Sequence, residues 1–279
     1  MSFILNKCPT DLIMITINNT PLTSSLFPGG EAHISLQDVP VGDCTVVWAF
    51  LESADEIMKL LLCMDALRRE APEGRVELHL PYMPYARQDR VCNPGEALSV
   101  RVMANLINSL QADSVTLYDP HSDVVGALID RVRIVPQHAL LQELTPFILD
   151  KSLALVAPDA GAEKKTHQFA QSLPAKVEIL YGSKVRDTQT GAITGTTVRG
   201  DATGRGVLLI DDICDGGRTF IELAKVLRAE GAEEIYLYVT HGIFSKGVEA
   251  LTPYFDHLYC YFAFPDVTPH NQLTILSQR

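Results

Sequence analysis

The feature that most constrains the fold is a regular alternation of strand-like and helix-like segments along the chain. Short apolar runs, such as residues 45–51 and 114–118, alternate with longer segments whose apolar residues recur at helical spacing, such as residues 55–70. This alternation is typical of parallel sheets whose two faces are covered by helices. We therefore predict an α/β fold.

The same pattern predicts where the individual elements lie. The expected strands are 45–51, 76–80, 114–118, 153–157, 177–181, 206–210, 234–239 and 257–261. The expected helices are 55–70, 97–110, 138–149, 162–173 and 220–230. The chain has 279 residues, which suits two domains at about 150 residues each. The alternation starts anew near residue 136, so we expect domains at 1–138 and 139–279.

One segment, residues 182–205, fits neither pattern. It is polar, carries five glycines and lacks helical periodicity. Connections longer than about 12–15 residues are usually functional lids or disordered. Because its threonines alternate in the stretch AITGTTVRG, we predict a hairpin flap.

Composition excludes several classes of protein. The formal net charge is −11 and the hydrophobic fraction is 47%, which argues against intrinsic disorder and against a nucleic-acid-binding protein. No apolar run approaches the roughly 20 residues of a membrane span, and Lys7 and Asp11 interrupt any signal peptide. The six cysteines lack zinc or disulfide spacing, so we expect free thiols and a cytoplasmic location.

The sharpest local motif is VLLIDDICDGGRTF at residues 207–220. An apolar strand is followed by two acids and a glycine-containing loop before a helix that is expected to begin near Phe220. In α/β sheets ligands bind beyond the carboxyl ends of strands, and backbone N–H groups at a helix N-terminus bind phosphate. We therefore expect a sugar phosphate to be bound by Asp211, Asp212, Asp215, Gly216, Gly217, Arg218 and Thr219.

A second motif, PYMPYARQDR at residues 81–90, places two arginines, a glutamine and an aspartate in four positions. Arginine is suited to bidentate phosphate contacts. This segment resembles the PY-x-x-YARQDR signature of the ribose-phosphate diphosphokinases, the phosphoribosyl pyrophosphate synthetases. The 207–220 motif resembles the phosphoribosyl-diphosphate-binding motif of the type I phosphoribosyltransferase superfamily. Ordinary phosphoribosyltransferases lack the former signature.

Three further segments follow the order of the diphosphokinase family. Residues 119–122 (DPHS) resemble its DLH segment, residues 158–161 (PDAG) its P-D-x-G loop, and residues 184–186 (KVR) the K-x-R of its catalytic flap. The resemblance covers residues 27–247 and implies two tandem phosphoribosyltransferase-like domains, each a mostly parallel sheet flanked by helices. It places ATP on the first domain and the ribose phosphate on the second.

The resemblance implies a magnesium-dependent transfer of the β,γ-diphosphoryl group of ATP to the anomeric hydroxyl of a ribose phosphate, with release of AMP. It assigns His121 and Asp159 to metal sites, and Lys184 and Arg186 to stabilisation of the transition state. The residues that it assigns to ATP are Arg87, Gln88, Asp89 and His121.

The family's F-x-D-G-E loop, which reaches ATP from a neighbouring subunit, corresponds here to residues 27–31. Phe27 and Glu31 match it, but Gly29 stands where the family has aspartate. The resemblance therefore implies a homo-oligomer, expected to be a hexamer, with the ATP site at a subunit interface.

The 5′-phosphate loop departs from the family pattern. The family reads D-T-[AG]-G-T, whereas residues 215–219 here read DGGRT. Gly216 opens space and Arg218 adds a positive charge, which raises a second hypothesis besides ribose 5-phosphate. The acceptor would then be a 5′-extended ribose such as ADP-ribose, giving ADP-ribose 1-diphosphate for NAD synthesis. An inactive regulatory subunit and a phosphoribosyltransferase are further alternatives.

Overall fold

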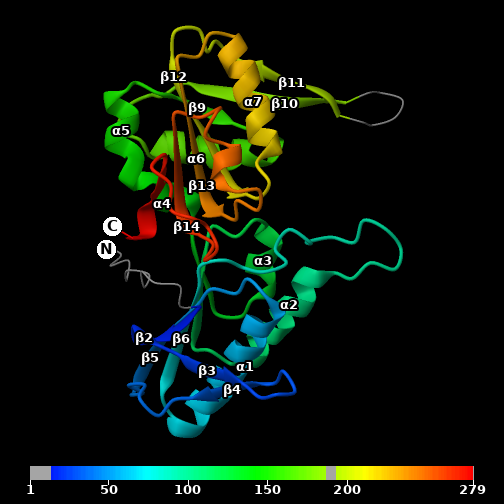
Figure 1. Ribbon diagram of the computed structural model, residues 1–279, viewed down its shortest axis with the longest axis vertical. Coiled ribbons are helices and arrows are strands. Elements are labelled where there is room, and N and C mark those ends of the chain that lie inside the picture. Colours follow the sequence, from blue (N-terminus) through cyan, green and yellow to red (C-terminus); the bar gives the residue numbers. More distant parts are fainter. Residues whose placement is uncertain (1–13, 187–192, 279) are drawn as a thin grey trace. The chain divides into compact units, whose positions relative to one another are not determined.

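The computed structural model describes residues 14–186 and 193–278. Its contacts divide the chain into two compact units, with the boundary between Val135 and Pro136 (Figure 1). Each unit has its own sheet and its own hydrophobic core. Among the residues described, no helix is long and apolar enough to cross a membrane.

Unit 1 is built on a six-stranded sheet in the order β2-β1-β5-β6-β7-β8, in which β5 to β8 are parallel. Its strands are β1 (Ile15–Ile17), β2 (Thr20–Pro21), β5 (Cys44–Ala49), β6 (Arg75–Leu80), β7 (Ser114–Tyr118) and β8 (Val132–Val135). A separate hairpin is formed by β3 (Thr23–Leu26) and β4 (Ala32–Ser35). The helices are α1 (Ala54–Glu70), α2 (Ser99–Ser109) and α3 (Asp123–Leu128).

The three helices of unit 1 pack into one core on one face of the sheet. Strands β5 to β8 follow each other in chain order, so right-handed crossovers bring every intervening helix to the same face. Outside that core, the ring of Trp48 stacks on those of His79 and Tyr118, with centroids 4.5 and 5.4 Å apart. Within the described residues of unit 1, the helices that connect β5 to β8 thus lie on one face of the sheet.

Unit 2 is built on a seven-stranded sheet in the order β11-β10-β9-β12-β13-β14-β15, antiparallel only between β10 and β11. Its strands are β9 (Ala154–Ala157), β10 (Ile179–Arg186), β11 (Ile193–Arg199), β12 (Gly206–Cys214), β13 (Glu234–Gly242), β14 (His257–Ala263) and β15 (Leu273–Ile275). The helices are α4 (Gln137–Leu140), η1 (Leu141–Leu144), α5 (Thr145–Asp150), α6 (Ala160–Ser172), α7 (Arg218–Ala229), η2 (Val248–Ala250) and η3 (Leu276–Gln278).

The strand order of unit 2 reverses between β9 and β12. From β9 the chain passes through α6 to β10 on one side, and from β12 it passes through α7 to β13 on the other. Helix α7 packs on the face that carries Ile235 and Leu237, while Phe147 of α5 packs on Tyr236 and Tyr259 of the opposite face. The helices thus cover both faces, and β9 and β12 flank a topological switch point, where ligands bind in open α/β sheets.

Two of the differences between the predicted and the observed elements have identifiable reasons. The single helix expected over 138–149 is broken into α4, η1 and α5, because Pro146 starts a new helix and cannot donate to the preceding turn. Strand β12 continues to Cys214, so Asp211 and Asp212 lie inside a strand and not after one. Pairing with β13 up to Gly242 extends it, which the local apolar pattern could not show.

Replacing Leu78 by alanine should lower the free energy of unfolding of unit 1 by about 2–5 kcal/mol, because a fully buried side chain leaves a cavity. Urea unfolding followed by the fluorescence of Trp48, the single tryptophan, measures it. The control is Ile134→Ala on β8, where the side chain is 44% exposed and the change should stay within about 0.5 kcal/mol. Equal losses in the two variants would contradict the assignment of the core.

Candidate active site

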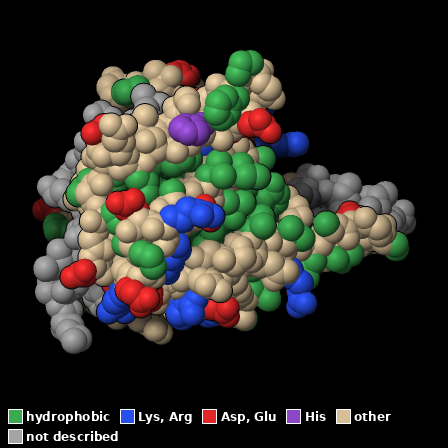
Figure 2. Space-filling view, turned by 90° about the horizontal axis from the view of Figure 1, so that it is seen from below, with side chains coloured by type: hydrophobic (Ala, Val, Ile, Leu, Met, Phe, Trp, Pro, Cys, Tyr) green, Lys and Arg blue, Asp and Glu red, His purple; other side chains and the backbone are tan. Residues whose placement is uncertain are grey.

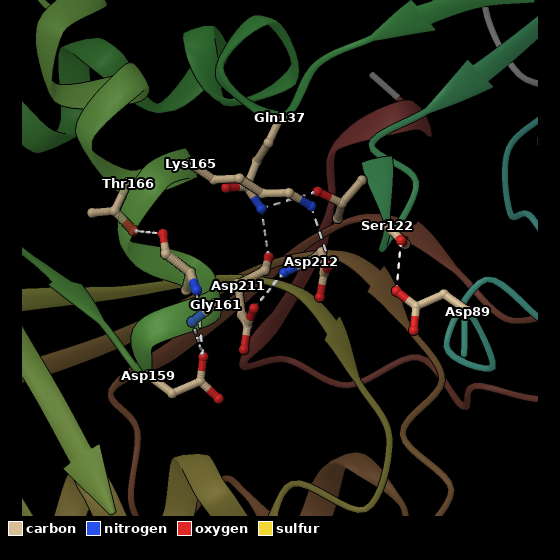
Figure 3. Close-up of polar contacts among 11 residues, drawn as sticks. Asp89, Ser122, Gln137, Asp159, Gly161, Lys165, Thr166, Asp211 and Asp212 are labelled. Atoms are coloured by element: carbon tan, nitrogen blue, oxygen red, sulfur yellow. Dashed lines mark hydrogen bonds and ion pairs between the residues drawn. The ribbon is translucent and has the colours of Figure 1, made fainter. Parts of the chain in front are cut away.

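The centre of the unit 2 site is the acidic pair at the carboxyl end of β12 (Figure 3). Asp212 is buried, and its Oδ2 lies 3.1 Å from Nζ of Lys165 on α6. The backbone N–H of Asp212 donates to Oδ1 of Asp211 at 2.9 Å. Burial raises the pKa of the Asp211 carboxyl well above its usual range, and the neighbouring charge of Asp212 adds to the rise.

Asp159, in the loop after β9, belongs to the same group of acids. Its Oδ1 accepts hydrogen bonds from the backbone N–H groups of Gly161 and Ala162, at 3.0 and 3.3 Å, and so caps helix α6. Its charge also contributes to the raised pKa of Asp211. Because β9 and β12 are paired neighbours, the acids meet at the switch point of the sheet.

The glycine loop after β12 leads into a helix whose first backbone N–H groups are not capped by a side chain. Helix α7 begins at Arg218, with Gly217 as its N-cap and no side chain capping it. Gly217 has φ +73°, and a Cβ there would lie 2.7 Å from Cδ2 of Leu251, so any other residue would be strained at this position. Uncapped N–H groups at a helix N-terminus are suited to bind an anion. Arg218 adopts helical backbone, so its replacement of a family glycine requires no strain.

The expected flap is a hairpin of β10 and β11. Lys184 and Arg186 lie on β10, where they pair with Thr196 and Ile193, and their side chains fall outside the described part. At the base of the hairpin, a Cβ on Gly182 would come within 2.6 Å of the Pro158 carbonyl oxygen. This close approach fixes the base of the hairpin beside the loop that carries Asp159.

In unit 1 the motifs at 81–90 and 119–122 meet. Oγ of Ser122 donates to Asp89 at 2.7 Å, and Nε of Arg90 donates to the same carboxylate at 2.9 Å. The hydrogen bond from Ser122, and then that from Arg90, lower the pKa of Asp89, and the nearby His121 lowers it further. Asp89 is therefore held ionised beside His121.

Two residues of these motifs have left-handed backbone without being glycine, namely Tyr85 (φ 61°) and Asp119 (φ 44°). Such strain concentrates at functional sites, where surrounding contacts maintain it. Gln88 is fixed by Ser99 at the start of α2, whose hydroxyl donates to its Oε1 at 2.5 Å. Arg87 is exposed. The residues predicted for ATP on this unit thus lie on one group of loops.

Phe27 and Glu31 lie at the tip of the β3–β4 hairpin. The N–H of Phe27 donates to the carbonyl of Glu31 at 2.9 Å, and the Phe27 ring is 54% exposed against the edge of His33. Gly29 has open space around it.

Exposed hydrophobic side chains also occur elsewhere, and Figure 2 shows hydrophobic side chains gathered at the centre of one face with Lys and Arg beside them.

Three residues that contact the predicted site residues were not predicted from the sequence. Lys165 carries the charge facing Asp212, Ser122 holds Asp89, and the Gln137 side chain donates to the Asp211 carbonyl at 2.8 Å. Ser122 directly follows His121, so its position gave a signal. Gln137 is 74 residues away from Asp211 along the chain, and no local pattern links them.

Among the described residues there is no group of three or more His, Cys, Asp or Glu side chains arranged to hold a metal ion. His121 belongs to unit 1 and Asp159 to unit 2. Their assignment to metal sites therefore remains a prediction.

Family models match most of the chain. Residues 12–110 match the N-terminal domain of ribose phosphate pyrophosphokinase, and residues 138–271 match the phosphoribosyl transferase domain. The structure is also similar to the crystal structure of phosphoribosylpyrophosphate synthetase from Mycobacterium smegmatis, with a TM-score of 0.76 and 26% identity over 91% of this chain and 85% of that one.

Curated relatives agree. The ribose-phosphate pyrophosphokinase of Corynebacterium efficiens is 31% identical over 83% of this chain and 72% of its own length. That of Granulibacter bethesdensis is 34% identical over 83% of this chain and 76% of its own length. With both domains matched in order and the fold shared, the chain belongs to the ribose-phosphate pyrophosphokinase family.

Proposed function

We propose that this protein transfers the β,γ-diphosphoryl group of ATP to the anomeric hydroxyl of ribose 5-phosphate and releases AMP. The observation that carries the proposal is the likeness to ribose-phosphate pyrophosphokinases over 83% of the chain. The arrangement of both motif groups at strand ends supports it.

The acceptor binds at unit 2 in this proposal. The N–H groups at the start of α7 and the hydroxyl of Thr219 bind its 5′-phosphate. Asp212, paired with Lys165 at 3.1 Å, accepts hydrogen bonds from ribose hydroxyls. Asp211 lies directly beside it, and burial together with the charge of Asp212 raises the pKa of its carboxyl.

The donor binds at unit 1. Arg87 binds the phosphates, and Gln88 and Asp89 orient the nucleotide. Phe27 and Glu31 are exposed at a hairpin tip, as residues that complete the ATP site of a neighbouring copy must be. We therefore include a homo-oligomer, expected to be a hexamer, in the proposal. The five cysteines that the structure describes are free thiols, which supports a cytoplasmic location.

The residues present are compatible with magnesium. Mg²⁺ is usually bound by one or two carboxylates together with substrate phosphates and water, and not by an all-protein cage. Asp159 supplies a hard oxygen donor at the switch point, and His121 lies beside the nucleotide motif. When bound, the ion would neutralise charge on the polyphosphate.

The chain's own residues then perform the transfer by positioning and charge. Lys184 and Arg186, on the hairpin whose base packs against the Asp159 loop, stabilise the charge that develops on the β-phosphoryl group. Closure of the hairpin excludes water, which would otherwise compete with the ribose hydroxyl.

The alternatives receive less support. No relative named above is described as acting on ADP-ribose, so the 5′-extended acceptor is not supported. A phosphoribosyltransferase would not need the N-terminal domain matched at residues 12–110. The inactive regulatory subunit is not favoured, because the relatives are named as enzymes.

AMP release tests the proposal. Purified protein with ATP and magnesium should release AMP when ribose 5-phosphate is added, and much less with ADP-ribose or with no acceptor. Chromatographic separation of AMP from ADP provides the measurement. AMP release mainly with ADP-ribose would overturn the choice of acceptor, and none with either would overturn the enzymatic proposal.

Alanine at Lys184 or Arg186 should lower kcat by about 10²–10³-fold, because a preorganised charge at the transition state is lost. Binding of ribose 5-phosphate, measured by calorimetry without ATP, should stay within twofold. Lys176→Ala, an exposed lysine before the hairpin, is the matched control. Unchanged kcat in both flap variants would refute their catalytic role.

Gly217→Ala should raise the KM for ribose 5-phosphate and cost about 1–3 kcal/mol of stability, because it forces a left-handed alanine against Leu251. Gly204→Ala is the control, since Gly204 also has positive φ (+65°) but open space around it. The control should lose stability and keep its KM. Equal KM values in both variants would show that this loop does not contribute to acceptor binding.

A further inference from the structure

A turn that no motif predicted lies against the loop between β12 and α7, residues 215–217, here called the acceptor loop. Residues 243–247, here called the 243–247 turn, follow β13. The N–H groups of Ile243 and Phe244 donate to the carbonyl of Cys214 at 2.9 and 3.0 Å, and that of Ser245 donates to the carbonyl of Asp215 at 3.2 Å. The Ser245 hydroxyl also donates to Oδ1 of Asp215 at 2.6 Å. The turn and the loop are therefore one hydrogen-bonded structure.

The conformation of this turn is strained and strongly constrained. Phe244 has φ 47° although it is not glycine, and its side chain is only 5% exposed. Its ring packs so closely on Gly242 that a Cβ there would lie 2.3 Å from Cε2. A bulky residue persists in left-handed backbone only where its surroundings enforce it, and such places are commonly functional.

The turn brings Lys246 over the acceptor loop. A Cβ on Gly216 would lie 3.6 Å from Cγ of Lys246, so the lysine stem passes beside this glycine. Lys246 and Arg218 are both exposed, and within the described part of the chain neither forms an ion pair or a side-chain hydrogen bond. Two cations that are unpaired among the described residues thus belong to the same loop structure, one beside Gly216 and the other at the first position of α7.

The acidic residues around the acceptor loop would repel a phosphate, so cations are needed there to bind it. A sugar phosphate entering this loop approaches Asp215, Asp212 and Asp159, all acidic, in a chain of net charge −11. A helix N-terminus supplies only about half a positive charge. A phosphate dianion therefore needs further compensation close by.

We propose that Lys246, together with Arg218, binds the 5′-phosphate of the acceptor and so determines acceptor affinity. This rests on the proposed function, since it concerns the acceptor of that reaction. Lys246 is an acceptor-binding residue that acts on the substrate directly, and the 243–247 turn positions it.

Steady-state kinetics of Lys246→Met test this inference. The KM for ribose 5-phosphate should rise about tenfold, as for loss of one charge-assisted hydrogen bond, while kcat and the KM for ATP stay within twofold. Lys246→Arg should restore most of the affinity. Lys225→Met removes an exposed lysine elsewhere on α7, paired with Glu222, and should change neither KM.

The double variant Lys246→Met/Arg218→Met decides whether the two cations act together. If they share one phosphate, the effects on KM are not additive. A ribose 5-phosphate KM within twofold of wild type in Lys246→Met would overturn the inference, as would an equal rise in both KM values with a lowered melting temperature.

Failure of the proposed function is distinguishable from failure of this inference. If the wild-type protein releases no AMP, calorimetric titration with ribose 5-phosphate alone still compares it with Lys246→Met. Weaker binding by the variant supports the role of Lys246, and equal binding refutes it.

Discussion

The ion pair between Lys165 and Asp212 holds together the part of the protein on which its chemistry depends. It joins helix α6 to the carboxyl end of β12, at 3.1 Å and largely out of water. Without it, Asp211, Asp212 and Asp159 would place like charges together in a poorly solvated environment, which is costly. Burial and the neighbouring charge of Asp212 already raise the pKa of Asp211. The reversal of strand order between β9 and β12 makes the meeting of these residues possible.

An acidic centre that receives anionic substrates, as proposed for unit 2, needs positive charge close by. The candidate sources are the backbone N–H groups at the start of α7 and two cations, Arg218 and Lys246, that are unpaired within the described part of the chain. In unit 1 Asp89 accepts hydrogen bonds from Arg90 and Ser122. Each unit therefore pairs one carboxylate of its motif with a neighbouring cation, Arg90 in unit 1 and Lys165 in unit 2.

The sequence predicted those helices, strands and motifs that are determined by residues adjacent along the chain. The strand at 114–118 and the helix over 55–70 were located to within one residue, because their apolar periodicity is local. The motifs around Asp89 and Asp211 were found because each is a run of contiguous residues that resembles a family signature. Contacts between distant segments were not predicted. Lys165 meets Asp212, and the 243–247 turn meets the acceptor loop, only through strand pairing that no local pattern encodes. The helix predicted over 138–149 is broken because Pro146 starts a new helix. The apolar periodicity of this segment gave no sign of the break.

In the proposed reaction, one step moves two phosphoryl groups together from ATP to the acceptor. ATP labelled separately at the β and γ phosphorus, incubated with ribose 5-phosphate and magnesium, tests this most directly. We expect both labels to appear in the same acceptor product in a 1:1 ratio, with unlabelled AMP released. Label from the γ position alone in the product, with β label retained in ADP, would contradict it.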